Sequence, residues 1–178
     1  MKKITFLVMV SAIFIACNNQ APKTDAPLGS IDEEKLNYPY TLDHPADNWD
    51  RGDQKNVVLV LNSFKAYQDG NVGECLKYFA DTVTLDFDNY HYRGPKDSVL
   101  AMFTTSRNNL ASMEVKMEDW EAVTSKDKKE EWVSLWYKQK TKDRTGKMDS
   151  VYCMDDLKIV NGKIAILDQK QRHFPGNK

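Results

Sequence analysis

The chain has 178 residues, which leaves room for one ordinary domain with extensions at its ends. Hydrophobic residues make up 41% and charged residues 29%, a mixture typical of soluble globular domains. The formal net charge is −1 and no basic block stands out, which argues against nucleic acid as a partner.

The chain begins with a pattern typical of export. A basic start, Met1-Lys2-Lys3, precedes an apolar run that is too short for a membrane span of about 20 residues. We therefore predict a signal peptide over residues 1–16. Phe14-Ile15-Ala16-Cys17 resembles a bacterial lipobox, although Phe14 departs from the usual leucine. The resemblance implies lipidation of Cys17 and anchoring to a membrane of the bacterial cell envelope, on its periplasmic or cell-surface side. The alternative is an ordinary secretory signal with an incidental cysteine.

Two segments of different composition follow. Residues 17–37 have few apolar anchors and are predicted to be the lipidated N-terminus and a flexible tether. Residues 38–53 carry several large apolar groups, which free linkers seldom do, and begin the domain that we assign to 38–178. We expect an irregular arm packed on this domain; a lid over a pocket is the alternative.

The next stretch predicts two helices and a strand. A helical stripe is formed by Val57, Val60, Leu61, Phe64 and Tyr67. Asp53 is its expected N-cap and Gly70 its expected end. Asn71 and Glu74 have the spacing of a capping box for a short second helix. From Val83 to Phe87 the apolar residues alternate, which indicates a half-buried strand.

The remainder predicts one more helix and a set of strands. A turn and short strand over 89–94 precede a third helix that Pro95 opens. The next strand changes parity near residues 118–119, which indicates a β-bulge. Glu131–Thr141 carries Trp132 and Trp136 on one face and Val133, Leu135 and Tyr137 on the other, so both faces should be covered. Val151–Ile159 and Lys163–Gln171 are strands joined at Asn161-Gly162, a strong hairpin signal.

Three stretches resemble the nuclear transport factor 2-like superfamily, and the resemblance covers about Asp53–Phe174. They are Phe64-Lys65-Ala66-Tyr67-Gln68-Asp69-Gly70-Asn71, Tyr78-Phe79-Ala80-Asp81 and Leu157-Lys158-Ile159-Val160-Asn161-Gly162-Lys163-Ile164. The resemblance implies an α+β cone, in which a strongly bent antiparallel sheet wraps around three N-terminal helices and leaves a pocket. Ketosteroid isomerases, polyketide cyclases, dehydratases and binding modules share this fold, so the fold alone does not fix the activity.

The ketosteroid isomerase pattern matches this chain at one position of three. That enzyme type needs an aspartate base, a tyrosine and a protonated aspartate. The base position falls on Phe87, the tyrosine position on Ser63, and only the second aspartate has a counterpart, Asp155. We do not expect this chemistry. Asp86 and Asp88 flank the lost base but should point to the other face of a regular strand.

Asp155 is the leading ligand-binding candidate because its strand neighbours of the same parity are apolar. The alternative is a structural carboxylate bonded to a nearby amide or tyrosine, and Asp156 replaces it if the register shifts. Tyr67 and Tyr137 are further candidates, although tyrosine is also ordinary core material. His91 is either at a pocket mouth or on the surface.

The other reactive residues carry weaker signals. Three scattered histidines have no metal-ligand spacing, and we predict neither a metal nor a cofactor. Export permits a disulfide between Cys75 and Cys153, but both lie on apolar faces, and we expect buried thiols.

The sequence favours a binding domain for a small apolar ligand or a partner protein. The alternative is an isomerase, dehydratase or hydrolase that uses Asp155 as acid or base, and a third possibility is a structural envelope component. A deep cavity with at least two polar groups around Asp155 favours the enzyme, and a purely apolar cavity favours binding. A cone filled by its own side chains favours a structural or partner-binding role. A homodimer through the outer sheet face is also expected, since that face needs cover.

Overall fold

The computed structural model describes residues 38–45 and 47–174. The predicted signal peptide, Cys17 and the tether lie outside these described residues. The chain divides into two compact units, residues 1–41 and 42–178. In the first unit, Tyr38 and Tyr40 are exposed. All helices and strands of the described residues belong to the second unit.

Two longer helices carry the apolar stripes that the sequence predicts: α1 (Gln54–Gln68) and α3 (Lys96–Asn108). The Asp53 carboxylate caps α1 by accepting a hydrogen bond from the Lys55 backbone N–H at 2.8 Å, as predicted. Gly70 follows α1 with a φ of +88°, which glycine adopts without steric cost. Pro95 precedes α3 as its N-cap, one position earlier than expected.

The second helix is shorter than its pattern suggests. It consists of α2 (Val72–Cys75) and a 3-10 turn, η1 (Leu76–Tyr78). The predicted capping box is wrong, because the Asn71 side chain makes no capping hydrogen bond. Asn71 acts through its backbone instead: its N–H donates to Ala66 O at 2.8 Å and its carbonyl accepts from the Cys75 N–H at 3.0 Å.

The described strands form one open sheet with the order β1-β4-β5-β6-β7-β2-β3. The strands are β1 (Trp49–Arg51), β2 (Phe79–Phe87), β3 (Tyr90–Pro95), β4 (Leu110–Ser125), β5 (Glu131–Asp143), β6 (Met148–Val160) and β7 (Lys163–His173). Neighbours are antiparallel except β2 and β7, which run parallel. No hairpin joins these two strands, so nothing local forces them to be antiparallel.

Local signals in the later strands are confirmed. The register of β4 against β5 shifts between Met117 and Asp119, where the bulge is predicted. Asn161 and Gly162 both have positive φ, 51° and 68°, as a two-residue type I′ hairpin turn requires. The short strand β1 is an addition: the sequence indicated only irregular structure there, but residues 49–51 pair with the end of β4.

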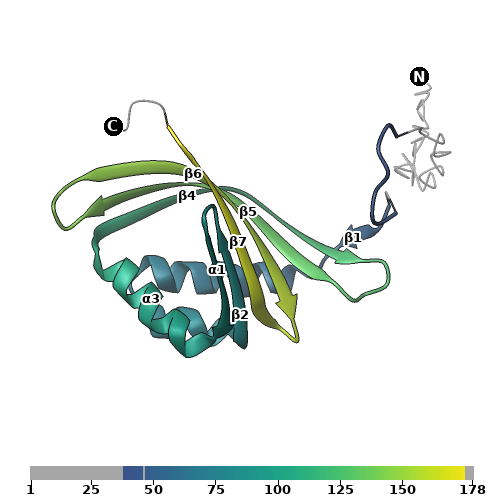
Figure 1. The fold of residues 1–178 in the computed structure, drawn as a ribbon, viewed down its shortest axis with the longest axis horizontal. Helices are drawn as coiled ribbons and strands as arrows, with labels where there is room; N and C mark the ends of the chain where they lie inside the picture. Colours follow the sequence, from purple (N-terminus) through teal and green to yellow (C-terminus); the bar gives the residue numbers. More distant parts are fainter. Residues whose placement is uncertain (1–37, 46, 175–178) are drawn as a thin grey trace, which may run out of the picture. The chain divides into compact units, whose positions relative to one another are not determined.

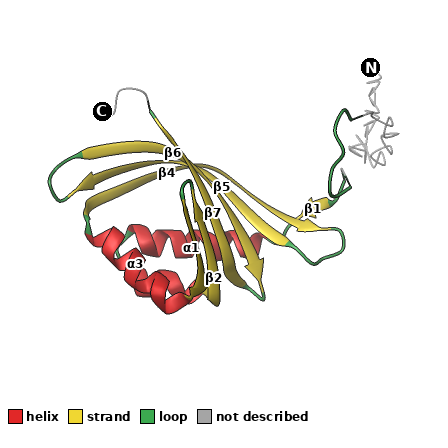
Figure 2. Cartoon of the chain, in the orientation of Figure 1, coloured by secondary structure: helices red, strands yellow, loops and turns green. Residues whose placement is uncertain are grey.

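The sheet bends over α1 and α3, which lie on the same face of it (Figure 1). Figure 2 shows this separation of helices and strands by colour. Val133, Leu135 and Tyr137 point from β5 toward the helices and are fully buried. Trp132 and Trp136 lie on the opposite face and are half-buried. This is the α+β cone that the sequence predicts, except that the sheet is mixed and not wholly antiparallel, because β2 and β7 run parallel. Among the described residues, no helix is long and apolar enough to cross a membrane.

Candidate functional site

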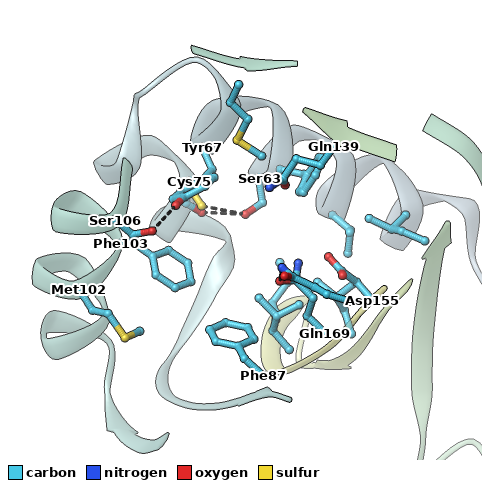
Figure 3. A pocket seen from close by; sticks show the side chains of 18 of the residues that line it. Ser63, Tyr67, Cys75, Phe87, Met102, Phe103, Ser106, Gln139, Asp155 and Gln169 are labelled. Atoms are coloured by element: carbon cyan, nitrogen blue, oxygen red, sulfur yellow. Dashed lines mark hydrogen bonds between the residues drawn. The ribbon is translucent and has the colours of Figure 1, made fainter. Parts of the chain in front are cut away.

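A cavity of about 550 Å³ lies between the helices and the inner face of the sheet (Figure 3). Its walls are mainly apolar and come from the helices, from β2 to β7 and from the turn that joins β2 to β3. The apolar lining residues are Val60, Phe64, Phe79, Phe87, Met102, Phe103, Leu110, Met113, Leu135, Leu157, Ile164 and Leu167. The cone is therefore not filled by its own side chains.

Asp155 is the carboxylate at the sheet side of this cavity. Strand β6 alternates, so Asp155 shares the inner face with the buried Cys153 and Leu157, and it is only 2% exposed. Its Oδ2 accepts a hydrogen bond from the Tyr137 hydroxyl at 2.9 Å. Its Oδ1 is buried and has no partner among the described residues. Burial of a carboxylate oxygen without a donor costs free energy, so a ligand that donates a hydrogen bond to Oδ1 would be favoured in the cavity.

A chain of hydrogen bonds across three strands ends on Asp155. The Gln171 side-chain amide donates to Gln169 Oε1 at 2.7 Å. Gln169 Nε2 donates in turn to the Tyr137 hydroxyl at 2.9 Å, which leaves the hydroxyl proton for Asp155. Every donor in this series points toward the carboxylate. The chain fixes the orientation of Asp155 and supports its ionised form.

Burial, in contrast, favours the neutral form of Asp155. Desolvation raises the pKa of Asp155 from 3.8 to about 7, with a further small increase from the neighbouring Asp156 carboxylate. The nearby Gln169 amide, the Tyr137 hydroxyl and the Lys170 charge lower the pKa, although the geometry gives the Gln169 amide a hydrogen bond to Tyr137 and none to Asp155 Oδ1. The pKa of the Tyr137 hydroxyl is raised well above its usual range, first by burial and then by the Asp155 charge. Asp155 is therefore the inner carboxyl that changes charge near neutral pH.

The helix side of the cavity carries hydroxyl and thiol groups (Figure 3). The Ser63 hydroxyl donates to the Cys75 carbonyl at 3.1 Å and lies 3.4 Å from the Cys75 sulfur. Tyr67 donates to the Ser106 hydroxyl at 3.3 Å. Burial raises the pKa of the Cys75 thiol, so this thiol is neutral at pH 7.

The four ligand-binding candidates occupy different places. Asp155 and Tyr67 line the cavity. Tyr137 is fully buried and does not line the cavity, but its hydroxyl is hydrogen-bonded to two lining residues, Asp155 and Gln169. His91 lies away from the lining, on β3, where its exposed ring contacts the Asp86 carboxylate. The structure thus brings two candidates to the cavity and gives Tyr137 a supporting position.

The register of β6 decides whether Asp155 or Asp156 faces the cavity. Asp156 points to the outer face, where its carboxylate accepts from Ser134 at 2.5 Å and pairs with Lys170 at 3.1 Å. Asp86 is also on the outer face, as expected. Asp88 is a correction: β2 ends at Phe87, and Asp88, with a φ of +32°, lines the cavity. The strand alternation that predicted its direction no longer applies in the turn.

Sequence reasoning missed the glutamines of the site. Gln139, Gln169 and Gln171 all line the cavity. Gln169 and Gln171 share the parity of Leu167 in the last strand, which was the signal available for their placement. The hydrogen bond from Gln169 to Tyr137 is not visible in the sequence, since it depends on the order of β5, β6 and β7 in the sheet.

The three positions compared with ketosteroid isomerase converge in space. Ser63, Phe87 and Asp155 all line the same cavity. The Ser63 side chain is shorter than the tyrosine it replaces, and Phe87 has no basic group. Asp155 is therefore the one of these three residues that can act as an acid or base.

The two cysteines and the acidic residues define no further centre. Cys75 and Cys153 are both free and buried, as predicted. In the described part of the chain, no group of three or more histidine, cysteine or acidic residues is arranged to hold a metal ion.

No known family's sequence profile matches the chain, and no curated protein matches it in sequence. Solved structures do match. An LEH-like epoxide hydrolase from M. tuberculosis is 12% identical with a TM-score of 0.56, over 67% of this chain and 84% of its own. A SnoaL-like polyketide cyclase, so described, from a Jannaschia species is 14% identical with a TM-score of 0.54, over 74% and 91%. A protein of unknown function from Burkholderia pseudomallei, described as nuclear transport factor 2-like, is 14% identical with a TM-score of 0.55, over 66% and 90%. The described domain therefore has the nuclear transport factor 2-like fold.

Proposed function

We propose that the domain binds a small, mainly apolar molecule inside the cone. One observation carries this proposal: a cavity of about 550 Å³ with apolar walls contains a buried carboxylate oxygen that lacks a donor. Ligand pockets typically have volumes of about 300–1,000 Å³, apolar walls and a few polar groups that orient the ligand. The walls supply affinity through burial of apolar surface, and Asp155 supplies orientation.

The neutral, environment-sensitive dye Nile red tests for an accessible apolar cavity. We expect its fluorescence to rise on binding to the wild-type protein. Thr141 lines the cavity from β5, and Lys140 next to it is exposed. Thr141→Trp should fill part of the cavity and weaken dye binding, whereas Lys140→Trp adds the same ring outside and should not. Equal dye binding by both variants would place the dye elsewhere and contradict the proposal.

An enzyme is the second candidate, and Asp155 is the observation that favours it. A carboxyl with a pKa of about 7 and one free oxygen toward the cavity can take or give a proton near neutral pH. Gln169 and Tyr137 add polar groups around it, which meets the condition that favours the enzyme. The epoxide hydrolase and the cyclase described above share the fold, and the fold does not transfer their activity.

Turnover of an apolar epoxide is the direct test of this second candidate. Product formation by the wild type that is lost in Asp155→Asn and kept in Asp156→Asn would support acid–base catalysis by Asp155. Product formation that survives in Asp155→Asn would remove Asp155 from that role.

We further propose that Cys17 carries a lipid anchor and that the domain pairs with a second copy through its outer sheet face. Trp136 and Tyr152 border a hollow of about 920 Å³ on that side of the domain. Trp132 is partly covered within the chain, because Lys158 lies 5.3 Å from its ring centroid and Glu130 accepts from its indole N–H. Trp136 is therefore the better candidate for contact with a partner.

A further inference from the structure

The charges around the cavity have one sign. Asp155 and Asp88 line it, and no lysine, arginine or histidine is among the described lining residues. The remaining polar lining groups are amides, hydroxyls and the Cys75 thiol, all of them uncharged at pH 7. An anionic ligand would therefore enter without a counter-charge and would face two carboxyl groups.

The nearest cations are already engaged elsewhere. Arg107 on α3 lies beside the cavity wall, but its guanidinium donates to the backbone carbonyls of Gln68 and Leu110, at 3.0 and 3.4 Å. Lys170 projects from the outer face of β7, where it pairs with Asp168 at 2.7 Å and Asp156 at 3.1 Å. Neither Arg107 nor Lys170 is among the residues that line the cavity, so neither offers a direct contact to an anion inside it.

The polar contacts of Asp155 favour a donor as its missing partner. Tyr137 donates to Oδ2, and Gln169 holds Tyr137 in that orientation, so both support a carboxylate that accepts. Oδ1 remains without a partner, and Asp155 is only 2% exposed to solvent. A cationic donor forms the stronger, charge-assisted kind of hydrogen bond to such an oxygen.

The apolar walls are also suited to a cation. The aromatic rings of Phe64, Phe87 and Phe103 line the cavity together with those of Phe79 and Tyr67. The faces of such rings attract ammonium groups, and the attraction grows when water is excluded. The same rings accept the hydrocarbon part of a ligand.

We propose that the cone binds a small apolar amine, held as an ammonium ion against Asp155 Oδ1 between aromatic walls, and that it rejects carboxylates. This inference rests on the proposed ligand-binding function and adds the chemical class of the ligand. It assigns Asp155 the role of counter-ion.

The proposal has a pH signature. The charged or titratable groups close to Asp155 on the sheet are Tyr137 on β5, Cys153 and Asp156 on β6, and Lys170 on β7. Those elsewhere around the cavity are Asp88 in the turn after β2, and Tyr67, Cys75 and Arg107 on the helix side. Tyr137 and Cys153 have raised pKa values and stay neutral up to pH 8. Asp155, whose pKa is about 7, is thus the group that ionises between pH 6 and 8. An alkylammonium remains charged throughout, so its affinity should be about tenfold higher at pH 8 than at pH 6.

Three probes on one hydrocarbon frame test the ligand class: naphthylethylamine, naphthylethanol and naphthylacetic acid. Displacement of Nile red from the full chain is measured with each probe at pH 6 and pH 8. We expect the amine to bind at least tenfold more tightly than the alcohol at pH 8, and the acid to bind weakest. If Nile red binds but the alcohol or the acid displaces it better than the amine, the amine proposal is overturned and the binding function stands. No dye or probe binding would overturn both.

Asp155→Asn keeps the size of the side chain and removes the charge. In this variant the amine should lose about tenfold or more in affinity at pH 8 and the pH dependence should disappear, while alcohol binding should fall by much less, because a neutral hydroxyl gains no ion pair from the carboxylate. Asp156→Asn is the matched control, because it removes a carboxylate of the adjacent residue on the outer face. Equal effects of the two variants would show a general charge effect and refute Asp155 as the counter-ion. Amine binding to the wild type that is equal at pH 6 and pH 8, or tighter at pH 6, would show that the Asp155 charge does not hold the ammonium, which also refutes the proposal.

Discussion

Replacing Asp155 by asparagine should stabilise the domain at alkaline pH. The folded protein raises the pKa of this carboxyl from 3.8 to about 7, because burial disfavours its charge. Between these two values the folded state holds a proton that the unfolded state releases, so stability falls as pH rises through this range. The stabilising contribution of the neutral carboxyl is complete below pH 3.8 and is lost above pH 7.

The size of the effect follows from the two pKa values. A pKa difference of one corresponds to 1.36 kcal/mol, so the full cost of ionised Asp155 is on the order of 4 kcal/mol. Between pH 5 and pH 8 alone, the linkage relation gives a change on the order of 3 kcal/mol. Asparagine carries no charge, and its side-chain oxygen can still accept the hydrogen bond from Tyr137. Relative to the wild type, the free energy of unfolding of Asp155→Asn should therefore rise by on the order of 3 kcal/mol on going from pH 5 to pH 8.

Urea unfolding followed by tryptophan fluorescence at both pH values measures this difference. All other ionisable groups are present in both proteins and cancel in the comparison. Asp156→Asn serves as the control, and its stability relative to the wild type should not change with pH in this way. A difference between Asp155→Asn and wild type that is the same at pH 5 and pH 8 would show that Asp155 titrates normally, and the reasoning from burial would fail.

Four further outcomes are expected. Cys17→Ser should release the protein from the membrane fraction of its native host; a wild type that is already soluble would contradict the lipoprotein proposal. Trp136→Lys should convert a dimer into a monomer in light scattering, and a monomeric wild type at high concentration would remove the basis for this expectation. Gly52→Ala should lower the free energy of unfolding by about 1–3 kcal/mol in thermal melts, because the added Cβ would lie 2.8 Å from backbone atoms of β4. Tyr137→Phe should destabilise by about 1–3 kcal/mol at pH 8 and less at pH 5, where Asp155 is protonated; equal losses at both pH values would separate Tyr137 from the charge of Asp155.

Features set by neighbouring residues could be predicted from the sequence. The Asp53 cap, the bulge near residues 118–119 and the Asn161-Gly162 turn depend on chemistry within a few residues, and the structure confirms all three. The alternation of β6 likewise placed Asp155 inside. Local reasoning was wrong at Asn71 and Asp88, where an expected pattern ended: α2 is only four residues long, and β2 stops at Phe87.

Features that join distant parts of the chain required the tertiary structure. Sequence alone determined that one carboxylate, Asp155, occupies an apolar strand face, because side-chain direction repeats every two residues in a strand. It did not determine that β7 lies between β6 and β2, which brings Gln169 to Tyr137 and places Asp88 at the cavity. Nor did it show that the cone stays open, or that the lining includes no cation among the described residues. Periodicity fixes the face on which a residue lies, whereas packing across the whole sheet fixes which residues meet there and what space remains between them.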